Sequence, residues 1–91
     1  MNQPKLYLCY SINDFYAREA GISMLSFLDN NPGYEPDEVF FIDYGIHPIN
    51  KERLNDIAAR YGKHVTFLNG RPAFTLIAAS VGALVVWIVW A

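Results

Sequence analysis

The sequence predicts an α/β fold in which parallel strands alternate with helices. Three short apolar or aromatic runs are separated by two amphipathic stretches, in the order strand, helix, strand, helix, strand. Such alternation indicates parallel strands joined by right-handed helical crossovers. At 91 residues, the chain has room for one domain with a modest core. We therefore expect a β-α-β-α-β unit, followed by a hydrophobic C-terminal segment.

Charge divides the chain into two parts. All charged side chains lie between Lys5 and Arg71, whereas residues 72–91 carry none. The formal net charge of -2 predicts no basic surface for a nucleic-acid partner. Because Cys9 is the only cysteine, an internal disulfide and a cysteine-based zinc site are excluded. We expect one domain over residues 1–72 and a hydrophobic helix, long enough to be transmembrane, over residues 73–91.

The first strand is predicted at residues 6–10, where apolar and aromatic side chains lack alternation and indicate burial on both faces of a sheet. Residues 11–14 are polar and can cap the helix that follows. That helix is predicted over residues 15–28, and it should end at the turn residues 29–33. Its apolar side chains recur at helical spacing at Ala17, Ala20, Met24, Leu25 and Leu28.

A second strand is predicted at residues 39–43 and a third at residues 65–68. Between them, Asn50 can cap a helix over residues 50–61. Gly62 follows the end of that helix, where a left-handed residue is usual. The buried stripe of this helix is predicted from the i, i+3, i+4, i+7 spacing of Leu54, Ile57, Ala58 and Tyr61.

The loops after the three strands form the expected binding edge, because ligands of parallel α/β sheets bind beyond the carboxyl ends of the strands. These loops comprise residues 10–14, 43–47 and 69–70. Asp43 is expected to end its strand and to order the turn at Gly45. We therefore expect a functional site among these loops.

The first of these loops carries Asn13, Asp14, Tyr16 and Ala17. This set resembles the Asn/Asp-Asp-x-Tyr-Ala element in the first nucleotide-binding loop of family 8 glycosyltransferases, the relatives of glycogenin and of bacterial lipopolysaccharide galactosyltransferases. Three further stretches resemble the family in order and spacing, at residues 21–32, 41–46 and 50–54. The resemblance extends over residues 6–69, nearly all of the charged part of the chain.

The resemblance implies a partial Rossmann-like nucleotide-diphospho-sugar transferase fold, with residues 1–72 as its nucleotide-sugar-binding half. The family transfers a hexosyl group from a UDP-sugar donor with retention of configuration. Carried over to this sequence, Asn13 would hydrogen-bond the uracil or the ribose, and Tyr16 would lie against the base. Ser11 and Ile12 would offer backbone groups to the base edge. A planar base favours such an aromatic neighbour and an amide that both donates and accepts.

The sequence departs from the family at the catalytic metal site. The complete family domain is expected to bind Mn²⁺ or Mg²⁺ through an Asp-x-Asp motif, and this chain contains no such motif. A diphosphate leaving group needs a cation to neutralise its charge. We therefore expect no catalytic residue and no metal ligand in this chain, weak binding of a UDP-sugar, and no hexosyltransferase activity of the isolated chain.

The segment from Phe74 to Ala91 contains no charged side chain and predicts a C-terminal helix. At about 1.5 Å per residue this helix would span roughly 27 Å, close to the ~30 Å hydrocarbon core of a bilayer. Trp87 and Trp90 suit an interfacial aromatic belt, and the basic residues before the segment predict a cytoplasmic location for the domain. We therefore expect contact with a membrane through this segment.

Two other interpretations of this segment stay open. It is a frameshifted or truncated end, at which the sequence leaves the family pattern, or it is a buried helix or strand, because residues 83–90 are rich in valine, isoleucine and tryptophan. We favour an anchor or an altered end, because a domain this small has little surface with which to cover so long an apolar segment. An anchor also predicts an alternative function, that of a small membrane-tethered α/β binding module without transferase activity.

Overall fold

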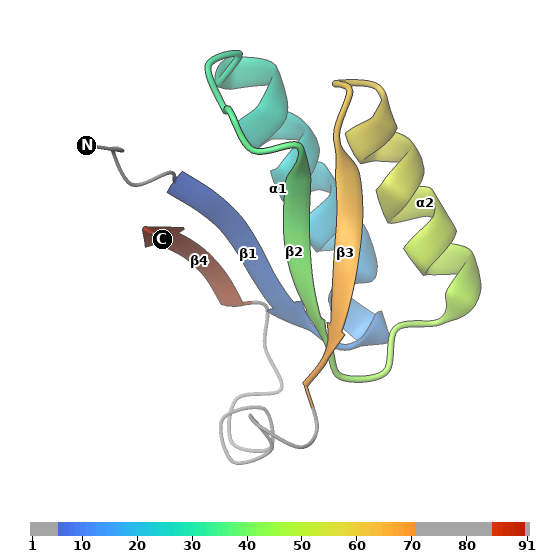
Figure 1. Ribbon diagram of the computed structural model, residues 1–91. Coiled ribbons are helices and arrows are strands. Elements are labelled where there is room, and N and C mark those ends of the chain that lie inside the picture. Colours follow the sequence, from blue (N-terminus) through green and yellow to red (C-terminus); the bar gives the residue numbers. More distant parts are fainter. Residues whose placement is uncertain (1–5, 71–84, 91) are drawn as a thin grey trace.

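The computed structural model describes residues 6–70 and 85–90 of the chain (Figure 1). In chain order the elements are β1 (Leu6–Ile12), the 3₁₀ turn η1 (Asp14–Tyr16), α1 (Ala17–Asn30), β2 (Glu38–Asp43), α2 (Pro48–Ala59), β3 (His64–Asn69) and β4 (Val85–Trp90). β1 pairs with β2, and β2 with β3, in parallel, so the predicted β-α-β-α-β unit is confirmed. The strand order across the sheet is β3-β2-β1-β4.

Helices α1 and α2 cover the same face of the sheet (Figure 1). Successive parallel strands are added in one direction, from β1 to β2 to β3, and right-handed crossovers then place both connecting helices on one side. The carboxyl ends of these three strands therefore lie at one edge of the sheet, where the loops after β1 and β2 begin. We call this edge the carboxyl edge.

The core lies between the sheet and the two helices. Tyr10, Phe41 and Met24 are fully buried, and the rings of Tyr10 and Phe41 stack with their centroids 4.9 Å apart. Phe41 also contacts the ring of Phe67, at 5.8 Å between centroids. The Tyr10 hydroxyl donates to Ser23 Oγ at 2.9 Å, so its polar atom has a partner inside the core. The three parallel strands and α1 thus share one aromatic centre.

The helices begin at other residues than predicted. Asn13 caps the short turn η1, and α1 starts only at Ala17. Helix α2 starts at Pro48 and not at Asn50, and its N-cap residue is His47. Proline is favoured at the first helical position because its φ is already helical and because it lacks the N–H that would be unpaired there. This property of proline explains the earlier start of α2.

Residues 85–90 form a strand and not the end of a helix. β4 pairs with β1 in antiparallel register, with Leu6 opposite Trp90. The prediction of a continuous helix from Phe74 to Ala91 is therefore wrong over β4, and the rest of that segment lies outside the described residues. The physical reason is that valine, isoleucine and tryptophan favour strands, and that the outer edge of β1 offers unpaired backbone groups. Within residues 6–70 and 85–90, no helix is both long enough and apolar enough to cross a membrane.

The Tyr34 hydroxyl joins the beginnings of β1 and β2. It accepts a hydrogen bond from the Leu8 backbone N–H at 3.0 Å and donates one to the Glu38 carbonyl at 2.8 Å. The Tyr34 side chain is buried, so water does not readily replace these bonds. Lys63 Nζ donates to the Tyr34 carbonyl at 2.9 Å and holds this loop against the start of β3. The hydroxyl therefore continues the β1–β2 pairing beyond the strand ladder.

We expect Tyr34→Phe to lower the free energy of unfolding by about 1–3 kcal/mol, because it leaves a buried backbone N–H and a carbonyl without their partner. Urea unfolding followed by circular dichroism measures this change. Tyr61→Phe is the matched control: the Tyr61 hydroxyl donates to Asp29 Oδ1 at the surface, at 3.3 Å. Its loss should cost less than about 0.5 kcal/mol. Equal destabilisation by the two variants would contradict the bridging role of Tyr34.

Candidate functional site

Asp14 holds together the loops that follow β1 and β2 at the carboxyl edge. Its Oδ1 accepts hydrogen bonds from the His47 backbone N–H at 2.8 Å and from Asn50 Nδ2 at 2.9 Å. These two donors, Asn50 first, lower the pKa of Asp14 below its ordinary value. The ionised carboxylate therefore fixes the start of α2 against the β1–α1 loop. Asn50 was predicted to cap α2, but its side chain makes this contact between loops instead.

Asp43 orders the loop after β2, as predicted. Its Oδ1 accepts from the backbone N–H groups of Gly45 at 2.8 Å and Ile46 at 2.7 Å. Gly45 has a φ of 111°, a conformation that favours glycine. Asp43 Oδ2 also lies 2.6 Å from Lys51 Nζ, a contact that the sequence did not predict. Burial raises the pKa of Asp43, but the Lys51 ammonium and the two N–H donors outweigh burial and hold the pKa below its ordinary value.

Gly70 closes the carboxyl edge after β3. Its N–H donates to the Asp43 carbonyl at 3.1 Å. A Cβ atom at this position would lie 2.7 Å from both Ile42 Cγ2 and Tyr44 Cζ, closer than carbon atoms can approach. The third predicted loop thus packs directly against the second, and only a residue without a side chain fits between them.

Asn13 and the aromatic residues after it lie where β1 gives way to α1. Asn13 Oδ1 accepts from the Phe15 N–H at 3.1 Å, while the Asn13 amide nitrogen donates no hydrogen bond within the described residues. Tyr16 is half-buried and packs against the core. Phe15 is 79% exposed, and its ring meets that of Tyr16 edge-on at 5.0 Å. The exposed ring of this loop is therefore that of Phe15, a residue that was not among the predicted site residues.

Ser11 and Ile12 lie inside the sheet. Both are buried, and Ser11 stands opposite Ile42 of β2 and Val85 of β4. The Ile12 carbonyl accepts a hydrogen bond from the Tyr44 N–H at 3.0 Å. Of the four residues that the family resemblance selected, only Asn13 and Tyr16 thus belong to the loop itself.

Metal ligands are not assembled at this edge. Among the residues that the structure describes, no group of three or more histidine, cysteine, aspartate or glutamate side chains lies close enough to hold a metal ion. The two aspartates of the carboxyl edge are engaged by protein donors, Asp14 by the start of α2 and Asp43 by its own loop and Lys51. This donor set does not fit Mg²⁺ or Mn²⁺, which bind several oxygen ligands.

The parallel strand order, the crossover helices on one face and the polar loops at the carboxyl edge define a Rossmann-like α/β domain. No family model matches the chain, and neither a curated protein nor a solved structure matches it significantly. The resemblance to family 8 glycosyltransferases therefore stays a prediction from sequence motifs.

Proposed function

We propose that this domain binds a uridine nucleotide or UDP-sugar at its carboxyl edge, as the nucleotide-binding half of a family 8 glycosyltransferase-like protein. The observation that carries the proposal is the pairing of a hydrogen-bonding amide with an exposed ring. Asn13 offers the amide and Phe15 the ring, and both follow directly after the first parallel strand. This is the edge at which parallel α/β sheets bind ligands.

The chemistry of the two side chains favours uracil. Because Asn13 Oδ1 is already bonded to the Phe15 N–H, the part of the side chain left for a ligand is the N–H₂ donor. Uracil presents carbonyl oxygens, which accept from such a donor, whereas on adenine the acceptor N7 stands beside the N6 amino group, a donor that opposes the amide N–H₂. The Phe15 ring is free to stack on a base, an interaction worth about 1–3 kcal/mol per base. In this arrangement Tyr16 packs the loop against the core, and the Phe15 ring stacks on the base.

The proposed role of this domain is to bind the nucleotide and not to catalyse transfer of the hexosyl group. Asp14 and Asp43 are engaged within the protein, and neither is placed to hold a cation that would neutralise a diphosphate. The domain is thus proposed to hold the donor nucleotide, while the groups that transfer a hexosyl residue would have to come from elsewhere. Neither the sugar nor an acceptor is specified by these residues.

We expect UMP to bind with a dissociation constant of about 1 mM, equivalent to about 4 kcal/mol. Titration followed by ¹H–¹⁵N NMR should shift the amides of residues 13–16, and AMP should shift them much less. Asn13→Asp retains an oxygen that can cap η1 but loses the N–H₂ donor, so it should abolish the preference for UMP over AMP while leaving the fold intact.

Phe15 provides a second, independent comparison. Phe15→Ala should weaken UMP binding at least about fivefold through lost stacking, whereas Phe15→Tyr keeps the ring and should bind like the wild type. The side chain is 79% exposed, so neither variant should disturb the core. An equal response of the folded wild-type chain to UMP and AMP, or unchanged binding by Phe15→Ala, would remove the basis of the proposal.

A further inference from the structure

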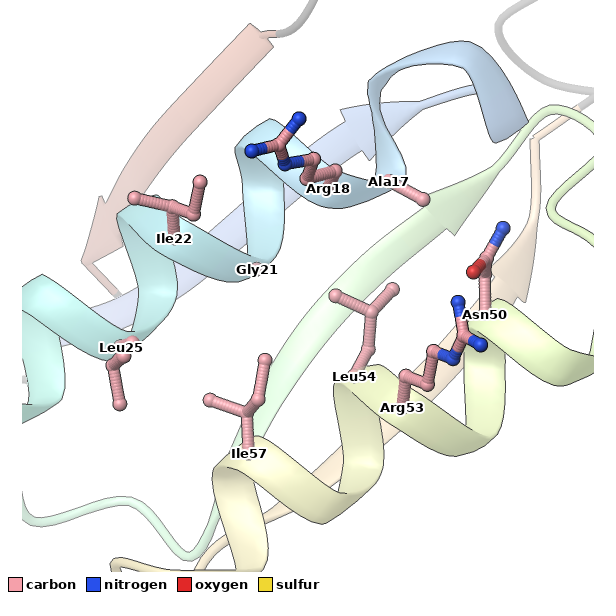
Figure 2. Close-up of a pocket in the computed structure, with 9 residues that line it drawn as sticks. All are labelled: Ala17, Arg18, Gly21, Ile22, Leu25, Asn50, Arg53, Leu54 and Ile57. Atoms are coloured by element: carbon pink, nitrogen blue, oxygen red, sulfur yellow. The ribbon is translucent and has the colours of Figure 1, made fainter.

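A groove runs between α1 and α2 on the side of the helices that faces away from the sheet (Figure 2). It has a volume of about 310 Å³. Gly21 forms its floor, because a Cβ atom there would lie 3.2 Å from Ile57 Cδ1 and 3.4 Å from Leu54 Cδ2. The absence of a side chain at Gly21 thus lets the two helices approach and leaves a channel above their contact.

The walls of the groove are apolar. Leu25 from α1 and Ile57 from α2 are half-buried, and Figure 2 shows both directed toward the space between the helices. Ile22 on α1 is 58% exposed, an unusual position for so large an apolar side chain on a helix that otherwise buries its apolar stripe. From Ala17 to Leu25 the groove extends along α1 for about 12 Å, at about 1.5 Å per residue, which is slightly more than two helical turns.

Two arginines flank this apolar channel, one on each helix. Arg18 on α1 and Arg53 on α2 both line the groove, and both are exposed. Within the described residues, neither forms an ion pair with a carboxylate. Arginine presents a planar set of donors that matches a carboxylate in two-point contact. The groove therefore combines an apolar floor with a positive rim on either side.

We propose that this groove docks an amphipathic helix of a partner protein, with apolar side chains toward Gly21 and acidic side chains toward Arg18 and Arg53. The dimensions favour a helix, because the lining residues extend along about two turns of α1 and the exposed side chains of Ile22, Arg18 and Arg53 leave the groove open to solvent. A fatty acid or similar amphiphile would instead need a cavity that encloses most of its surface. The guanidinium groups of Arg18 and Arg53 would pair with carboxylates on the two flanks of the partner helix. Apolar side chains of that helix at i, i+3 or i+4 and i+7 would fill the floor of the groove.

The probe is a fluorescein-labelled, alanine-rich helical peptide with leucine at i, i+3, i+4 and i+7 and glutamate on both flanks, titrated into the full chain. We expect saturable binding, weakened by salt, with NMR shifts at Arg18, Gly21 and Ile57. The same peptide with lysine in place of each glutamate should bind at least about tenfold more weakly, equivalent to about 1.4 kcal/mol. Peptides with the leucines moved by one and by two positions test other registers.

Exposed positions provide variants that do not endanger the fold. Ile22→Glu and the double variant Arg18→Gln, Arg53→Gln should each weaken binding of the glutamate peptide at least about tenfold. Their matched controls are Ile49→Glu, whose side chain is 46% exposed outside the groove, and Arg60→Gln at the end of α2. Both controls should bind like the wild type.

Two outcomes would overturn the proposal. The first is that none of the glutamate peptides, whatever the positions of its leucines, shifts the NMR signals of the groove residues at about 1 mM. At that concentration even a complex worth about 4 kcal/mol is half formed. The second is binding of dodecanoate or of phosphatidylglycerol vesicles to the groove without binding of the peptide, which would assign it to an amphiphile or a membrane. Neither outcome depends on uridine nucleotides, so the two proposals fail separately.

Discussion

Replacing Phe41 with alanine is expected to lower the free energy of unfolding of this domain by about 3–5 kcal/mol, the usual cost of truncating a buried phenylalanine. Phe41 is fully buried, stacks on Tyr10 and contacts Phe67, so truncation leaves a cavity that three strands share. A domain of this length has a total stability of roughly 5–14 kcal/mol, at about 0.05–0.15 kcal/mol per residue. The free energy lost with the Phe41 ring would therefore be a large share of the total stability of the domain.

Phe15→Ala is the matched control for Phe41→Ala. It removes the same side chain from a position that is 79% exposed, and it should change stability by less than about 0.5 kcal/mol. Urea midpoints from tryptophan fluorescence and circular dichroism measure both variants. A Phe41→Ala protein as stable as the Phe15→Ala protein would show that the aromatic stack is not the centre of the core.

Asp43→Ala is expected to lower the free energy of unfolding by about 1.5–3 kcal/mol at neutral pH, the range typical of hydrogen bonds to a charged group. It removes the acceptor of the Gly45 and Ile46 N–H groups and the partner of Lys51. Asp37→Ala is the control, because Asp37 is exposed and its side chain makes no hydrogen bond or ion pair within the described residues. If the two variants were equally stable at pH 7, Asp43 would not be the residue that holds the loop after β2.

The cost of Asp43→Ala should depend on pH in a defined direction. The pKa of Asp43 is lowered in the folded chain from its ordinary value of 3.8. Its ionisation therefore stabilises the fold fully above that value, and the contribution is lost as the pH falls through the lowered pKa. The difference in unfolding free energy between wild type and Asp43→Ala should be largest near neutral pH and should shrink below pH 3.8. A difference that grows on acidification would contradict the assigned contacts.

Local patterns were sufficient to predict the order of the elements and part of the carboxyl edge. Alternating apolar runs and helical stripes predicted the three parallel strands and both helices. The contact of Asp43 with Gly45 could be predicted without the rest of the fold, because the two residues are only two positions apart. Gly62 has the positive φ, 72°, that its place after α2 predicted. These features depend on residues that are close together in the sequence.

The features that were not predicted depend on residues that are far apart in the sequence. Asn50 resembles a helix cap locally, but its amide donates to Asp14, 36 residues earlier in the chain. The Tyr34 hydroxyl accepts a hydrogen bond from the N–H of Leu8, which lies 26 residues earlier in the chain. Phe15 lies in the 3₁₀ turn that precedes α1, outside the helix to which the sequence assigned it, and its side chain is exposed there. A strand over residues 83–90 was one of the open interpretations and was ranked below an anchor, because the apolar composition of β4 suits a helix in a membrane as well as a strand in a sheet.

The position of β1 between β2 and β4 has a consequence for the order of folding. The β1–β2–β3 unit can form from residues 6–70 as soon as they leave the ribosome, whereas β4 pairs Trp90 with Leu6, across almost the entire chain. Once β3 is in place, this pairing still requires the chain to pass from β3 at one edge of the sheet to the outer edge of β1 at the other, so it follows the formation of the parallel strands. Until β4 docks, the outer edge of β1 presents unpaired N–H and C=O groups at Cys9 and Ser11, because the backbone groups of Leu8 and Ile12 face β2. This edge is a template on which another nascent chain can add a strand. The interval between the synthesis of β3 and the docking of β4 is thus the time at which this chain is most exposed to aggregation.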